Sequence, residues 1–163
     1  MKIGVLSDTH DQLSNLLAAL AACREQGIDT LIHCGDLTGL EMVSHFEGFR
    51  MIYTTGNMDF ATGAIKKRFE KMRADNFVGP VFRGQFDRVN VAATHSHIES
   101  KVMDLVSSKK YRWIFHGHTH QRRDEEINGV RIVNPGALGG LAKEARSFCI
   151  VDLNAEIVQF IMV

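Results

Sequence analysis

Five short polar clusters carry the side chains with which this chain could do chemistry. They are Asp8-Thr9-His10, Gly35-Asp36, Gly56-Asn57-Met58-Asp59, Thr94-His95-Ser96-His97 and Gly117-His118-Thr119-His120. Almost every cluster directly follows an apolar run typical of a strand. Carboxylates, imidazoles and a carboxamide form a mixed oxygen and nitrogen donor set that suits divalent metals, and this set is too rich for a single ion. The pattern indicates a hydrolase that uses two metal ions on a phosphate ester.

Length, charge and cysteine content limit the possible number of domains, the possible partners and the possible location of the chain. The 163 residues fit one domain, residues 1–163, with a sizeable core. Basic and acidic residues both number 19, so no basic excess predicts an extended nucleic-acid track. No apolar stretch approaches the roughly 18 residues of a membrane span, and no signal sequence is visible. The three widely spaced cysteines favour reduced thiols and a cytoplasmic location.

The first half of the sequence alternates strands with helices. Strands are predicted over residues 3–6, 30–34 and 51–55. A helix capped by Asp11 and stopped by Gly27 follows the first strand, a short helix covers 40–46, and an exposed helix covers 61–72. This order predicts a parallel sheet with right-handed crossovers.

The second half is richer in hairpins. Strands 78–83 and 89–94 flank a predicted turn at Gly84-Gln85, and an amphipathic helix over 98–106 precedes a buried strand at 113–115. Further hairpins are predicted around Asn128-Gly129 and Asn154-Ala155. Together, the two halves of the sequence predict two packed sheets covered by helices.

Taken one at a time, most of the polar clusters have a purely structural explanation. Asp8 could cap a helix, Gly35-Asp36 could be an ordinary turn, and the Gly56–Asp59 segment is a turn signature. His118 and His120 are a stronger signal, because side chains two residues apart in an extended segment point the same way. The main argument is convergence, since ligands in open α/β sheets bind beyond the carboxyl ends of the strands.

The other histidines are predicted to have different roles. His33 and His45 are interpreted as structural or solvated, because one lies within a strand and the other on a short helix. His116 alternates with His118 but lies deeper in its strand. A hydrogen-bonded supporting role or a place in the core is expected for it.

The clusters together resemble the signature of the calcineurin-like metallophosphoesterases. Three flanking segments resemble in particular the small bacterial and archaeal phosphodiesterases of the YfcE-like branch: Ser7 to Asp11, His33 to Asp36, and Asn134-Pro135-Gly136. The resemblance runs nearly from end to end. It implies a four-layer α/β/β/α sandwich of two mixed sheets, with a dinuclear metal centre between them.

The resemblance also assigns the metal ligands. One ion would be held by Asp8, His10 and His120, the other by Asn57, His95 and His118, and Asp36 would bridge the two. Manganese is the expected metal, with nickel, zinc, iron and magnesium as alternatives that affinity order alone does not separate. The implied reaction is hydrolysis of a small phosphodiester by a hydroxide held between the metals.

Two departures from the family pattern bear on catalysis. Met58 stands where many members carry a histidine that protonates the leaving group, and Ser96 stands where a glycine is usual. His97 is the candidate to assist the leaving group instead. Asp59 is expected to orient Asn57 or a neighbouring histidine.

Several alternatives stay open at the level of sequence. A phosphomonoesterase or a nuclease of the same family is the first, although a nuclease would be expected to carry a basic track. A non-catalytic scaffold of this fold, such as a retromer subunit, is the second. A structural zinc domain is disfavoured because no cysteine lies in a ligand cluster. An exposed strand or helix face could support a homo-oligomer.

Overall fold

The computed structural model describes residues 1–98 and 100–163. Its first sheet has six strands in the order β11-β10-β1-β2-β3-β4. They are β1 (Lys2–Leu6), β2 (Thr30–His33), β3 (Arg50–Thr54), β4 (Phe77–Gly79), β10 (Ser147–Asp152) and β11 (Ile157–Met162). Strands β1 to β4 pair in parallel, whereas β10 and β11 join as antiparallel strands. The sheet is therefore mixed, with a parallel part formed by the predicted strand–helix repeat.

The second sheet has five strands in the order β5-β6-β7-β9-β8. They are β5 (Val81–Phe86), β6 (Val89–Thr94), β7 (Trp113–His116), β8 (Arg122–Ile127) and β9 (Val130–Pro135). The central strand β7 is parallel to both of its neighbours, and the outer pairs are antiparallel hairpins. The Asn128-Gly129 hairpin forms as predicted between β8 and β9.

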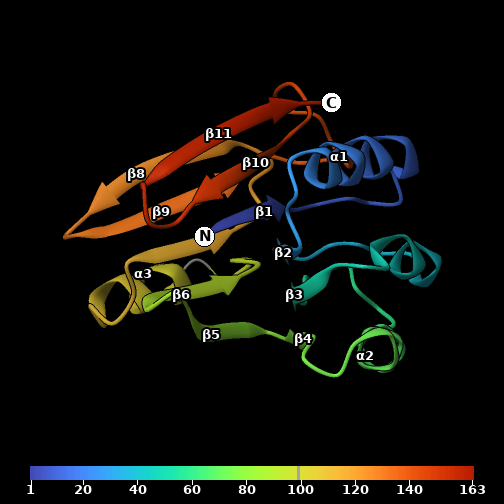
Figure 1. The fold of residues 1–163 in the computed structure, drawn as a ribbon, viewed down its shortest axis with the longest axis horizontal. Coiled ribbons are helices and arrows are strands. Elements are labelled where there is room, and N and C mark those ends of the chain that lie inside the picture. Colours follow the sequence, from blue (N-terminus) through green and yellow to red (C-terminus); the bar gives the residue numbers. More distant parts are fainter. Residues whose placement is uncertain (99) are drawn as a thin grey trace.

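Helices cover the outer faces of the two sheets (Figure 1). They are α1 (Leu13–Glu25), the 3₁₀-helix η1 (Leu40–Phe46), α2 (Thr62–Met72) and α3 (Ser100–Ser107). In Figure 1, α1 and α2 lie on the side of the first sheet and α3 lies on the opposite side, next to the second sheet. This confirms the predicted α/β/β/α sandwich of two mixed sheets.

Three apolar clusters hold the four layers together. The first joins the inner faces of α1, η1 and α2 to the first sheet, the second fills the space between the sheets, and the third joins α3 to the second sheet. The side chains of β1 alternate between the two faces of the sheet. Ile3 and Val5 pack in the second cluster, between the sheets, and Leu6 packs in the first cluster, beneath the helices. A strand buried on both faces explains the continuous apolar runs of the sequence.

The hairpin turn predicted at Gly84-Gln85 is wrong by three residues. Strand β5 continues through both residues, and the turn lies at Asp87-Arg88, where both φ angles are positive at 45° and 69°. That backbone matches the tight turn favoured by the twist of antiparallel strands. Gly84 is instead a strand residue whose missing side chain leaves room for the ring of Phe82, which a Cβ would approach to 2.4 Å.

Two helix predictions also need correction. Asp11 does not cap α1, because Gln12 is the N-cap residue and the Asp11 carboxylate accepts a hydrogen bond from the Gly39 N–H at 2.6 Å. Helix α2 is not wholly on the surface, since Ile65 and Phe69 are fully buried in the first apolar cluster. Within the described part of the chain, no helix is long and apolar enough to cross a membrane.

Candidate metal centre

The predicted ligands lie at the ends of neighbouring parallel strands. Asp8, Asp36 and Asn57 follow β1, β2 and β3 in the first sheet. His95 follows β6 in the second sheet, and His118 follows the adjacent strand β7. Because parallel strands end at the same edge, each sheet delivers its polar residues to one place. The two sheets face each other, so the two edges form a single site.

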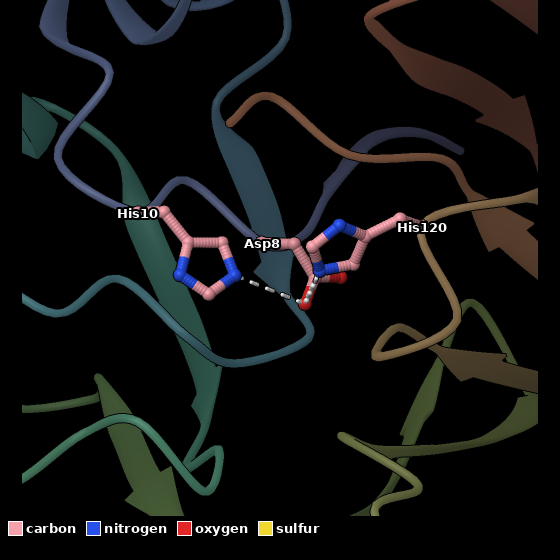
Figure 2. Close-up of side chains that lie close together, drawn as sticks. All are labelled: Asp8, His10 and His120. Atoms are coloured by element: carbon pink, nitrogen blue, oxygen red, sulfur yellow. Dashed lines mark ion pairs between the residues drawn. The ribbon is translucent and has the colours of Figure 1, made fainter. Parts of the chain in front are cut away.

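Asp8, His10 and His120 form the first group of metal-ligating atoms, which all lie within 4.8 Å of one another. The His120 Nε2 lies 3.3 Å from the Asp8 Oδ1, and the His10 Nε2 lies 3.8 Å from the same oxygen. Figure 2 shows both rings directed at this carboxylate from opposite sides. Both Asp8 Oδ1 and His10 Nε2 are buried without a hydrogen-bond partner among the described residues. Buried polar atoms normally have partners, so this cluster fits a bound cation.

Asp36, His95 and His118 form a second group, also within 4.8 Å of one another. The His95 Nε2 lies 3.2 Å from the Asp36 Oδ2 and 3.2 Å from the His118 Nδ1. The carboxamide oxygen of Asn57 is 3.0 Å from the same His95 nitrogen. Two imidazole nitrogens, a carboxylate and a carboxamide oxygen thus converge, which is the donor set that divalent ions bind.

Asp36 belongs to the second group and also approaches the first. Its Oδ2 is 3.2 Å from the His95 Nε2 in the second group and 3.8 Å from the His10 Nε2 in the first. Its other oxygen is already occupied, since Oδ1 accepts a hydrogen bond from the Met58 N–H at 2.8 Å. The structure therefore leaves Oδ2 as the oxygen that faces both groups.

Comparison with known proteins identifies the family. The sequence model of the calcineurin-like phosphoesterase superfamily domain matches residues 1–156. The chain belongs to this superfamily. The family predicted from the five clusters is thus confirmed, and with it the prediction of a phosphoesterase.

Individual relatives of this phosphoesterase agree with the family match. The chain is 32% identical over 154 residues to the phosphodiesterase MJ0936 of Methanocaldococcus jannaschii, covering 93% of both proteins. A solved structure described as a novel archaeal phosphodiesterase superposes with a TM-score of 0.95 over the whole of both chains, at 30% identity. YfcE, a phosphoesterase from E. coli, superposes with a TM-score of 0.70 over both full chains, and at 17% identity it shows the fold alone.

The backbone of this phosphoesterase domain takes an uncommon conformation at its predicted ligands. Positive φ angles between 43° and 69° occur at Asp8, His10, Asp36, His118 and His120. Left-handed backbone is uncommon outside glycine, although Asp and His tolerate it better than most residues, and such outliers cluster at functional sites. The sharp turns direct these side chains from the strand ends into the space between the sheets.

Hydrogen bonds behind the ligands fix how they point. The Nδ1 of His95 lies 2.7 Å from the Cys34 carbonyl oxygen, which leaves Nε2 facing the site. His120 is held in the same manner, with Nδ1 2.8 Å from the Leu141 carbonyl oxygen. Such contacts determine which ring nitrogen is available to a metal.

Ser7 is a supporting residue to which sequence reasoning gave no role. Its hydroxyl donates to the Asp8 Oδ2 at 2.6 Å, and the His118 main-chain N–H donates to the same oxygen at 2.9 Å. Both bonds direct Oδ1 of Asp8 toward the histidines. The position of Ser7 directly before the first motif was the only available signal, and a serine beside an aspartate is too common to be diagnostic.

Asp59 does not have the contacts predicted for it. Among the described residues its carboxylate accepts four hydrogen bonds, none of them from Asn57 or a histidine. The donors are the main-chain N–H groups of Asp36, Thr38 and Gly56, at 2.7 to 3.2 Å, and the hydroxyl of Tyr53, at 2.5 Å. The turn after β3 folds Asp59 back beneath the loop that carries Asp36. Asp59 therefore positions the Asp36 backbone rather than a neighbouring side chain.

Charge distribution in the site favours ionised carboxylates. Burial opposes ionisation of Asp8, but the adjacent imidazole of His120 and the charge of His95 hold its pKa below the ordinary value. Burial also opposes ionisation of Asp36, and the hydrogen bond and charge of His95 lower its pKa in the same way. Both carboxylates are thus negatively charged at neutral pH, as metal ligands must be.

His33 and His116 support the site from outside the ligand groups. Burial lowers the pKa of each to about 4, so both rings are neutral at physiological pH. The His33 Nε2 is 2.8 Å from the Thr9 hydroxyl, and the His116 Nδ1 is 3.2 Å from the Ser96 hydroxyl. Of the two roles predicted for His33, structural or solvated, its full burial favours the structural one, and the contact of His116 agrees with the hydrogen-bonded role expected of it.

The last two predicted positions differ in what they bring to the site. His97 is exposed, with its ring centroid 5.8 Å from that of His95 and 6.4 Å from that of His118. It therefore lies beside the second ligand group without entering it. Met58 contributes its main-chain N–H to Asp36, and its side chain is 39% exposed.

Proposed function

We propose that this chain is a phosphodiesterase that hydrolyses a small phosphodiester with the help of two divalent metal ions, within a single domain spanning residues 1–163. The observation that supports it best is the pair of adjoining ligand groups, with the Asp36 Oδ2 of the second group 3.8 Å from the His10 Nε2 of the first. The relative from Methanocaldococcus jannaschii is named a phosphodiesterase, and it aligns with nearly the whole chain.

The ligands are proposed to divide as the two groups suggest. One ion would be held by Asp8, His10 and His120, the other by Asn57, His95 and His118, with Asp36 between them. When bound, two divalent ions supply positive charge for the phosphate oxygens and lower the pKa of a water toward ~7, so that a nucleophile is available. The mixed oxygen and nitrogen ligands suit manganese, and nickel, zinc, iron and magnesium are the alternatives.

The protein's own groups would then orient the substrate and assist the leaving oxygen. Asn57 presents a neutral carboxamide beside the site and can hydrogen-bond a phosphate oxygen. His97 stands next to the second ligand group and is proposed to hydrogen-bond the departing oxygen. Because Met58 has no proton to give, we expect diesters with good leaving groups to react fastest.

The proposal is tested by assaying an activated aryl phosphodiester and the matching monoester. Metal-stripped protein would receive manganese, nickel, zinc, iron or magnesium in turn, and release of the phenol would be followed by absorbance. Metal-dependent cleavage that favours the diester is the expected result. A preference for the monoester would instead support the phosphomonoesterase alternative.

Absence of turnover with every metal, despite two bound ions per chain, would favour the scaffold alternative. Vps29 of Entamoeba histolytica, solved with zinc, has the same fold with a TM-score of 0.72 at 17% identity. We favour catalysis because all seven predicted ligand positions of this chain carry residue types that bind metals. A cytoplasmic location and a homo-oligomer both stay predictions.

The role of His97 predicts how activity depends on the leaving group. Replacing His97 with alanine should reduce kcat/KM about 100-fold for diesters with poor leaving groups, because general acid assistance is worth about that much. The loss should be small for 4-nitrophenyl esters, whose leaving oxygen needs little help. The measurement is kcat/KM across a series of phenols of rising pKa, with His45→Ala as the control. An equal loss across the whole series would contradict the assignment.

A further inference from the structure

A pocket of about 380 Å³ adjoins the candidate metal centre on the side of α3. His118, which belongs to the second ligand group, and His97 form the part of its wall nearest the centre. Val102 and Met103 of α3 form an apolar wall, and Arg123 of β8 provides a cationic one. The metal ligands do not account for this space, which is large enough for an organic group carried by the phosphate.

The walls favour an aromatic occupant over an aliphatic one. The Met103 side chain is 45% exposed, and thioethers make favourable contacts with aromatic rings. Arg123 donates a hydrogen bond to Glu125, which restrains its guanidinium, and planar guanidinium groups stack on aromatic faces. The imidazoles of His97 and His116 add further flat surfaces. The same pocket offers a long aliphatic chain little apolar surface beyond Val102 and Met103.

A buried histidine ring belongs to the same wall. His116 is 3% exposed, and its Nε2 has no hydrogen-bond partner among the described residues. Side chains alternate along β7, so His116 lies on the α3 face of the sheet together with Ile114 of the third apolar cluster, which joins α3 to the second sheet. This side of the wall is therefore formed by a buried ring with little freedom to move.

From these observations we infer that the pocket is a specificity subsite for an aromatic ester group of the substrate. The inference rests on the proposed function, and it narrows the substrate class to phosphodiesters that carry at least one flat aromatic group. Met103 and Arg123 are its specificity-determining residues. The phosphate would lie at the ligand groups, and the ring would lie between α3 and β8.

Equilibrium binding tests the subsite without any turnover. Metal-loaded protein would be titrated calorimetrically with phenylphosphonate and with methylphosphonate, neither of which carries an ester bond to hydrolyse. Phenylphosphonate should bind roughly tenfold more tightly, because the pocket removes an additional apolar surface from water. The Met103→Gln variant should lose most of that advantage while keeping its affinity for methylphosphonate, which serves as the internal check of folding and of metal loading.

Leu17 provides a matched control, since it is 43% exposed on α1, remote from the pocket. Leu17→Gln should keep the full preference for the phenyl compound. Equal affinities for the two phosphonates, no detectable binding of phenylphosphonate, or a preference that survives Met103→Gln would overturn the subsite. Failure of the catalytic proposal would appear separately, as no diester hydrolysis in a protein that still prefers phenylphosphonate.

Discussion

Replacing Asp36 with asparagine should reduce diester turnover by on the order of a thousandfold, since metal-derived charge stabilisation is worth several kcal/mol. The Asp36 Oδ2 is the atom that faces both ligand groups, at 3.2 Å from His95 and 3.8 Å from His10. Asparagine has the same shape and can still accept the hydrogen bond from the Met58 N–H, so the fold should persist. The variant removes the negative charge and little else.

The measurement combines kcat/KM with the number of bound metal ions per chain, determined by elemental analysis. We expect the variant to bind fewer ions than the wild type and to melt cooperatively in its metal-free form. Asp104→Asn, an exposed aspartate on α3, is the matched control and should retain activity. Full turnover in the Asp36 variant would contradict the shared-ligand assignment.

Replacing Asp59 with alanine should lower the free energy of unfolding by about 3–5 kcal/mol, because several buried donors lose their acceptor at once. The Asp59 residue is only 5% exposed, and its carboxylate holds the backbone of Asp36, Thr38 and Gly56. The appropriate measurement is urea unfolding of metal-free protein, since bound metal would add its own stabilisation.

Tyr53→Phe separates the contribution of the Tyr53 hydroxyl from that of the other hydrogen bonds to the Asp59 carboxylate. It removes one donor to Asp59 and also the acceptor of the buried Leu37 N–H, so it should cost about 2 kcal/mol, less than Asp59→Ala, because the phenyl ring can keep its packing. Asp104→Ala is the exposed control and should unfold like the wild type. If Asp59→Ala left stability unchanged but abolished activity, Asp59 would act on the substrate rather than on the backbone beneath Asp36.

The amino-acid sequence by itself determined the family, the four-layer fold and the residue types of the site. Asp8, Asp36 and His95 each follow an apolar strand, and parallel strands end at a common edge, so their meeting was predictable from local pattern. Strand β1 illustrates the same rule for packing, because its alternation assigned Ile3 and Val5 to one layer and Leu6 to another. Hydrophobic periodicity and the order of strands along the chain are properties of the sequence itself, which is why the sequence predicts them.

The tertiary structure alone decided the features that depend on contacts between distant segments. Asp59 was assigned to the wrong partner because its acceptor role depends on how the turn after β3 packs on the loop after β2. The β5–β6 turn lies at Asp87-Arg88 because β5 stays paired with β6 as far as Phe86, which is opposite Val89. The pocket beside His118 requires α3 and β8 to be positioned against β7, and no spacing in the sequence specifies that placement. Side-chain packing across such separations is set by the whole fold, so local pattern cannot predict it.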